Sequence, residues 1–91
     1  MKLIGKFELQ DPFGNKKTLS ISTDRENGHV SYRLVNNHTS FAISNMQCGW
    51  RGPKLPDNTY EYPTNTNLMS AVKEAINGGV YSIIEEKLFV K

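Results

Sequence analysis

Residues 19–34 decide the fold, and they read LSISTDRENGHVSYRL. Within this stretch the less polar side chains occupy alternate positions: Leu19, Ile21, Thr23, Val30, Tyr32 and Leu34. A period of two is typical of strands with one buried face. Asn27-Gly28 between the two runs is the strongest sequence signal for a two-residue hairpin turn. We therefore predict a β-hairpin with its turn at Asn27-Gly28, in which Thr23 lies opposite Tyr32.

The alternation continues upstream of this hairpin. The apolar residues there that share one parity are Leu3, Phe7 and Leu9. The turn over residues 11–15 contains proline and glycine, which favour a reversal of the chain. A turn of odd length centred on Gly14 places Leu9 opposite Leu19, so that both apolar sets face the same side. This predicts a further strand before the hairpin.

A fourth strand is predicted downstream, where Phe41 and Ile43 alternate with polar residues. A two-residue turn at Asn37-His38 places Phe41 opposite Leu34 and Ile43 opposite Tyr32. The apolar parities then agree across the turns, and a slip of one residue would put an apolar set on the wrong face. The sequence thus predicts a four-stranded antiparallel β-meander over residues 1–44.

Residues 45–67 are predicted to form a long irregular loop. Its turn-forming residues are Gly49, Gly52, Pro53, Pro56 and Pro63. Loops of this length without structure of their own are uncommon in compact domains and are often functional. The alternative is a packed connector that covers one end of the sheet.

A helix is predicted over residues 68–78, with Thr66 or Asn67 as its N-cap and Gly78 or Gly79 at its end. Its apolar stripe consists of Leu68, Val72, Ala75 and Ile76, with Met69 at the margin. The β-branched and aromatic residues within 80–90 favour a C-terminal strand, although residues 80–87 also suit a second helix. The predicted fold class is α+β, in a single domain over residues 1–91.

Composition limits the class of protein. The 91 residues carry a net charge of +2, which is too small to indicate a partner by itself. No apolar run approaches the ~18 residues of a membrane span, and no secretory signal is expected. Cys48 is the only cysteine, so an internal disulfide and a cysteine-rich zinc site are excluded, and the cytoplasm is the expected location.

Familiar catalytic and cofactor motifs are absent from the sequence: it contains no dinucleotide fingerprint, P-loop, zinc-protease motif or nucleophile elbow. Cys48 with His29 or His38 is the only plausible pair of nucleophile and base. The two histidines lie at opposite ends of the predicted third strand, which disfavours a two-histidine metal site. We therefore expect no cofactor, no metal and no catalytic residue.

The candidate binding segment is Cys48-Gly49-Trp50-Arg51-Gly52-Pro53-Lys54. Trp50 is the only tryptophan, and it stands beside Arg51 in a region, residues 27–56, that contains no carboxylate. Tryptophan and arginine are the residues most enriched at binding hot spots. The alternative is that Trp50 folds back over the thin core as a plug. Both roles can coexist.

A second candidate surface is the solvent-facing side of the sheet. The register predicts that its central row consists of Lys6, Ser22, Arg33 and Ala42. Small side chains allow another surface to approach closely, so this face is a candidate docking surface. A single strand of nucleic acid would instead use Lys6, Arg33, Arg51 and Lys54 for phosphates, and Trp50, Tyr60 and Tyr62 for stacking.

These features favour a small non-enzymatic protein-interaction module that acts stoichiometrically, as an adaptor, subunit or inhibitor. Its asparagine-rich, motif-poor sequence is typical of accessory proteins of bacteriophages and mobile elements. The alternatives are a weak single-stranded nucleic-acid-binding domain and a cysteine-dependent enzyme or small-ligand site. Self-association through an edge strand, either residues 40–44 or the C-terminal strand, is also expected.

Overall fold

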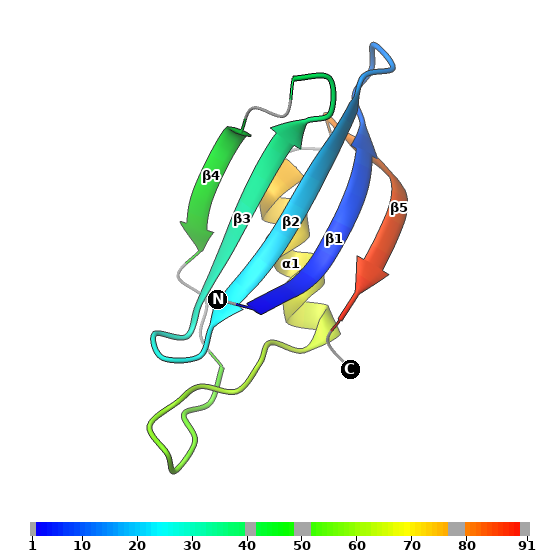
Figure 1. The fold of residues 1–91 in the computed structure, drawn as a ribbon. Coiled ribbons are helices and arrows are strands. Elements are labelled where there is room, and N and C mark those ends of the chain that lie inside the picture. Colours follow the sequence, from blue (N-terminus) through cyan, green and yellow to red (C-terminus); the bar gives the residue numbers. More distant parts are fainter. Residues whose placement is uncertain (1, 40–41, 49–51, 77–79, 90–91) are drawn as a thin grey trace.

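The structure, a computed structural model, describes residues 2–39, 42–48, 52–76 and 80–89. One antiparallel sheet and one helix make up the fold, which confirms the α+β class (Figure 1). Along the chain the elements are β1 (Lys2–Gln10), β2 (Lys16–Asp24), β3 (His29–Asn36), β4 (Ala42–Cys48), α1 (Asn65–Ile76) and β5 (Ser82–Leu88).

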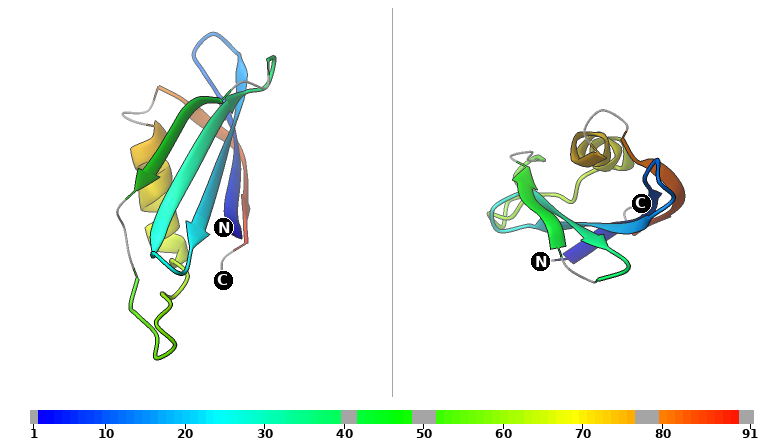
Figure 2. Two further views of the ribbon diagram at one scale, coloured as in Figure 1. Left: turned by 60° about the vertical axis from the view of Figure 1, so that its left-hand side comes forward. Right: turned by 90° about the horizontal axis from the view of Figure 1, so that it is seen from above.

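The sheet has five strands in the order β4-β3-β2-β1-β5. The first four strands pair with their neighbours in sequence, so the predicted meander is confirmed. The chain then leaves β4 at one edge, crosses one face of the sheet as α1, and returns as β5 beside β1. Figure 2 shows α1 on one side of the sheet and no described element over the other side. We call this second side the open face.

The core lies between α1 and the sheet. The helix contributes Leu68, Ala71, Val72 and Ala75. The strands contribute Ile4, Phe7, Leu9, Leu19, Ile21, Val30, Tyr32 and Leu34. Most of these side chains are fully buried, and each such side chain stabilises the fold by roughly 1.5–3 kcal/mol relative to exposure. The predicted apolar parities of β2 and β3 therefore point to the correct face.

The predicted register of the central hairpin is wrong by two residues. Thr23 pairs with Val30, not with Tyr32, because the loop consists of the four residues Arg25–Gly28. The Asp24 carboxylate accepts hydrogen bonds from the Glu26 N–H (2.9 Å) and from the Asn27 side chain (2.8 Å). These bonds stabilise the longer loop, and Gly28 closes it with a φ of 72°. A shift of two residues preserves the buried face.

The hairpin of β1 and β2 is also shifted by two residues. Its turn spans five residues, as expected, but Leu9 pairs with Lys17 instead of Leu19. A register shift between Leu3 and Gly5 inserts Ile4 as an extra residue in β1. This β-bulge buries Ile4 and places Leu3, which is 40% exposed, opposite Ser22. The expectation that Leu3 faces the core is therefore wrong.

The predicted pairing of β3 with β4 is wrong in parity. Tyr32 pairs with Met46 and Leu34 with Ser44, whereas Ile43 was expected opposite Tyr32. The register shifts between Leu34, which pairs with Ser44, and Val35, which pairs with Ala42. Ile43 therefore has no direct partner in the ladder. β4 also continues to Cys48, four residues beyond the predicted meander. Phe41 and Ser40 lie outside the described residues.

The helix begins three residues earlier than predicted, at Asn65, because Thr64 is its N-cap. The Thr64 hydroxyl accepts a hydrogen bond from the Asn67 N–H (3.3 Å), and the Thr64 carbonyl accepts one from the Leu68 N–H (2.9 Å). Gly78 and Gly79 lie outside the described residues. In the described part of the chain, no helix is both long and apolar enough to cross a membrane.

Candidate protein-interaction surface

Pairing across the sheet places one row of polar residues side by side on the open face. From one edge to the other, the row is Lys87, Lys6, Ser20, Arg33 and Asn45. Directly paired residues on adjacent strands project to the same side. The three cations are exposed, and Lys6 and Arg33 are two strands apart, about 10 Å. We call Lys87, Lys6 and Arg33 the cationic row.

The predicted row differs from the observed one in two of its four members. Ser20 stands where Ser22 was expected, and Asn45 stands where Ala42 was expected. Both differences follow from the register shifts described above. The sequence nevertheless placed Lys6 and Arg33 in one row, and the structure brings them together. Ser20, Ser22 and Ser31 are half-buried. Their short side chains project little from the middle of the open face.

The next row toward the β1–β2 turn is acidic at the β5 edge. Glu8 pairs with Glu85, directly beside the pair of Lys6 and Lys87. Glu8 is held from the other side, where its carboxylate oxygens lie 3.0 Å from the Thr18 hydroxyl and 3.2 Å from the Asn37 side-chain nitrogen. The two rows lie about 7 Å apart along the strand. Like charges placed directly opposite one another destabilise a sheet.

These charges line a shallow hollow of about 340 Å³ on the open face. Its other walls are apolar, formed by Leu3 and Phe89, which are 40% and 42% exposed. The hollow therefore combines strips of both charges with two exposed apolar side chains.

The loop between β4 and α1 carries three more of the predicted site residues: Lys54, Tyr60 and Tyr62. Lys54 and Tyr60 form an isolated β-bridge, and the Lys54 ammonium lies 5.8 Å from the centre of the Tyr60 ring. The bridge closes a tight turn in which the Leu55 N–H donates to the Thr59 carbonyl (2.7 Å). Asn58 has a φ of 68° in this turn, a conformation that asparagine tolerates better than most residues.

Arg25 attaches this loop to the β2–β3 turn. Its guanidinium donates to the Tyr60 carbonyl (3.0 Å) and to the Thr59 hydroxyl (3.0 Å). The Thr59 N–H and hydroxyl in turn bond to Asp57, and these bonds lower the pKa of the Asp57 carboxyl below its ordinary 3.8. The loop is thus connected to the sheet through a charged side chain, a contact that sequence patterns do not reveal.

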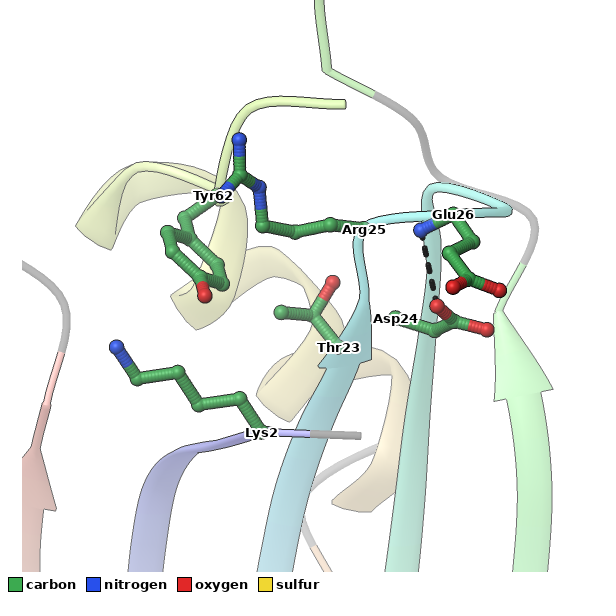
Figure 3. Close-up of a pocket in the computed structure, with 6 residues that line it drawn as sticks. All are labelled: Lys2, Thr23, Asp24, Arg25, Glu26 and Tyr62. Atoms are coloured by element: carbon green, nitrogen blue, oxygen red, sulfur yellow. Dashed lines mark hydrogen bonds between the residues drawn. The ribbon is translucent and has the colours of Figure 1, made fainter. Parts of the chain in front are cut away.

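Tyr62 lies in a small pocket of about 220 Å³ at the same end of the sheet (Figure 3). The Lys2 ammonium lies 4.6 Å from the centre of its ring, and the Arg25 guanidinium lies 5.1 Å from it. Asp24 and Glu26 complete the charged lining. Both cations lie within cation–π range of the ring of Tyr62, which is itself exposed.

Trp50 and Arg51 lie outside the described residues, so their roles remain predictions. Cys48 pairs with Val30 in the sheet. Val30 is next to His29 at one end of β3. His38 lies in the turn at the other end of that strand. Among the described residues, no group of three or more histidine, cysteine, aspartate or glutamate side chains could hold a metal ion.

Phe13 is a surface residue that sequence reasoning missed. Its side chain is 88% exposed at the tip of the β1–β2 turn. The turn is held by Asp11, whose carboxylate accepts bonds from the N–H groups of Phe13 (2.9 Å) and Asn15 (2.8 Å). Burial raises the pKa of Asp11, but these bonds and Lys17 outweigh it and leave the pKa below 3.8. The sequence signal for this exposed side chain was the position of an aromatic residue between the turn-forming residues Pro12 and Gly14.

The chain matches no protein-family model, no curated protein and no solved structure.

Proposed function

We propose that this protein is a non-enzymatic module of the cytoplasm that binds another protein stoichiometrically, as an adaptor, subunit or inhibitor. The open face of the sheet carries the contact. The observation that supports this most directly is the pairing of like charges on that face, Lys6 with Lys87 and Glu8 with Glu85.

Pairing of like charges costs stability in the isolated domain. A partner with the reverse arrangement of charges would relieve that repulsion and would align itself on the two rows. Electrostatic complementarity of this kind contributes mainly specificity and speed of association. The serines in the middle of the face let the partner approach the sheet closely, and Leu3 and Phe89 offer apolar area at the margin.

Single-stranded nucleic acid is the second candidate, and the cationic row is the observation that favours it. Three cations in one row can neutralise about three phosphates, which gives weak binding that falls steeply with salt. Glu8 and Glu85 lie beside that row and repel a phosphate backbone. The acidic residues therefore favour a protein partner over a nucleic acid.

Ser20→Tyr tests the proposal, because it adds bulk to the middle of the open face without changing charge, and tyrosine is favoured in strands. The matched control is Ser70→Tyr, on the exposed side of α1. In affinity capture from cell extract, wild type and Ser70→Tyr should retain one protein at a fixed molar ratio, and Ser20→Tyr should lose it. Equal retention by Ser20→Tyr, or no captured protein, would contradict the proposal.

A labelled single strand of about 15 nucleotides distinguishes the second candidate, measured by anisotropy at low and at physiological salt. Binding that is lost in Lys6→Glu, but kept in Lys73→Glu on the exposed side of α1, would favour nucleic acid instead. We expect no anisotropy change at physiological salt.

A further inference from the structure

β5 is an edge strand whose outer side has no partner among the described residues. It pairs with β1 alone, at the margin of the sheet (Figure 1). All of its residues from Ser82 to Lys87 are exposed, including Ile83 (37%) and Ile84 (48%). An exposed edge offers a row of unpaired N–H and C=O groups to another strand.

The backbone of β5 shows which groups face outward. The Phe89 N–H donates to the Ile4 carbonyl at 3.0 Å, toward β1. In an antiparallel ladder, successive residues alternate between the two sides. Lys87 and Glu85 therefore direct their backbone groups to β1, and Glu86 and Leu88 direct theirs to the open edge.

We infer that β5 pairs with β5 of a second copy of this chain, antiparallel, about a two-fold axis that passes through Glu86. This inference uses the edge of the sheet and needs no partner on the open face, although it shares Glu85 and Lys87 with that face. It joins two five-stranded sheets into one continuous sheet of ten strands with both open faces on the same side.

Charge selects this register. With the axis at Glu86, Glu85 of each copy lies opposite Lys87 of the other. Both side chains lie on the open face, because Glu85 pairs with Glu8 and Lys87 with Lys6 inside each copy. The pairs of Glu85 with Lys87 are not hydrogen-bonded pairs of the new ladder, and such pairs have the closer side chains.

The neighbouring registers lack this complementarity. An axis at Glu85 places Glu85 opposite itself, and an axis at Lys87 places Lys87 opposite itself. If the axis lay between two residues, side chains on the open face of one copy would lie opposite side chains on the core face of the other. Directly paired residues of adjacent strands project to the same side, so this register is excluded. β5 contains a bulge at Ile84, between the pairs of Glu8 with Glu85 and of Leu9 with Ile83, so the regular ladder about the axis at Glu86 includes the pairs of Glu85 with Lys87.

The same register places Glu86 opposite its own copy at the axis. This is the one repulsive pair of the ladder. Glu86→Gln removes that repulsion and should tighten the dimer by about two- to five-fold. A strand that does not pair with itself would not respond to this substitution.

Sedimentation equilibrium over about 10–500 µM measures the dimer directly. Wild type should form dimers. Glu85→Lys and Lys87→Glu should each weaken the dimer by about ten-fold or more, because each converts two attractive pairs into two repulsive pairs. An equimolar mixture of the two variants restores opposite charges across the axis and should form heterodimers.

Glu74→Lys and Lys73→Glu are the matched controls, since they make the same charge changes on exposed positions of α1. Both should dimerise like wild type. Circular dichroism verifies that each variant is folded. A monomeric wild type across the whole range, unchanged dimerisation of Glu85→Lys, or a mixture that stays monomeric would overturn the inference.

Discussion

Arg25 and Tyr60 bond to each other twice, although 34 residues separate them in the sequence. The Arg25 guanidinium donates to the Tyr60 carbonyl at 3.0 Å, and the Tyr60 N–H donates to the Arg25 carbonyl at 2.8 Å. Through this relationship the loop between β4 and α1 is held against the β2–β3 turn. The backbone and the side chain of one residue thus both connect these two segments at the end of the sheet.

Arg25→Ala should destabilise the protein by about 2 kcal/mol, because it removes charge-assisted bonds to Tyr60 and Thr59 in a half-buried setting. Urea denaturation measures the free energy of unfolding. Proteolysis within residues 52–62 should also become faster, since the loop loses both side-chain bonds to Arg25 and keeps only the backbone bond from the Tyr60 N–H. Arg33→Ala, at an exposed position, is the control and should change stability by less than about 0.5 kcal/mol. Equal losses for both variants would contradict the anchoring role of Arg25.

Gly5→Ala should destabilise the fold by about 1–3 kcal/mol, because the bulge brings this position against the helix. A Cβ atom at Gly5 would lie 3.1 Å from the Phe7 ring and 3.2 Å from the Leu68 side chain, both of which are fully buried. In the background of Leu68→Ala, which opens space there, the cost of Gly5→Ala should fall. A double-mutant cycle in urea measures this coupling, and additive costs would contradict it.

Asp57 should contribute to acid sensitivity. Its bonds to Thr59 lower its pKa in the folded state. The contribution of Asp57 to the stability of the fold is therefore complete above the ordinary carboxyl pKa, and it disappears as the pH falls through the pKa of the folded state. Asp57→Asn should therefore show a shallower loss of stability below about pH 4 than wild type. Thermal melts from acid to neutral pH test this, with Glu74→Gln as the control for net charge. Parallel profiles of Asp57→Asn and wild type would be inconsistent with the role of Asp57.

Phe13→Ser should leave the midpoint of thermal unfolding unchanged, within the equivalent of about 0.5 kcal/mol, because the side chain makes almost no contact with the domain. Asp11→Ala, which removes the bonds that shape the same turn, should lower the midpoint. A differential scanning measurement compares the two variants. A large loss in Phe13→Ser would mean that its ring packs against the protein.

The alternation of apolar residues predicted the sheet and the buried faces of β2 and β3, because the period of a strand is independent of its exact register. The registers of the first two hairpins were wrong by two residues, and the pairing of β3 with β4 was wrong in parity. Two-residue turns were assumed from dipeptides, whereas Asp24 stabilises a four-residue loop through side-chain bonds. The bulge at Ile4 moves Leu3 off the expected core face, because an inserted residue breaks the period of two.

The candidate surface was predicted in part for the same reason. Lys6 and Arg33 share a row in spite of the register errors, because the two-residue shifts of the two hairpins cancel: Lys6 pairs with Ser20, and Ser20 pairs with Arg33. The pairs with Glu85 and Lys87 could not be predicted, because nothing in the sequence states which strand β5 joins. The contacts of Arg25 also depend on the three-dimensional path of the loop.

Lysine acetylation of the captured complex, read by mass spectrometry, tests the central claim most directly. If the open face binds a protein, Lys6 and Lys87 should be protected from the reagent in the complex relative to the free protein, and Lys73 on the outside of α1 should react equally in both. If Lys6 and Lys87 react in the complex as they do in the free protein, the open face is not the contact surface.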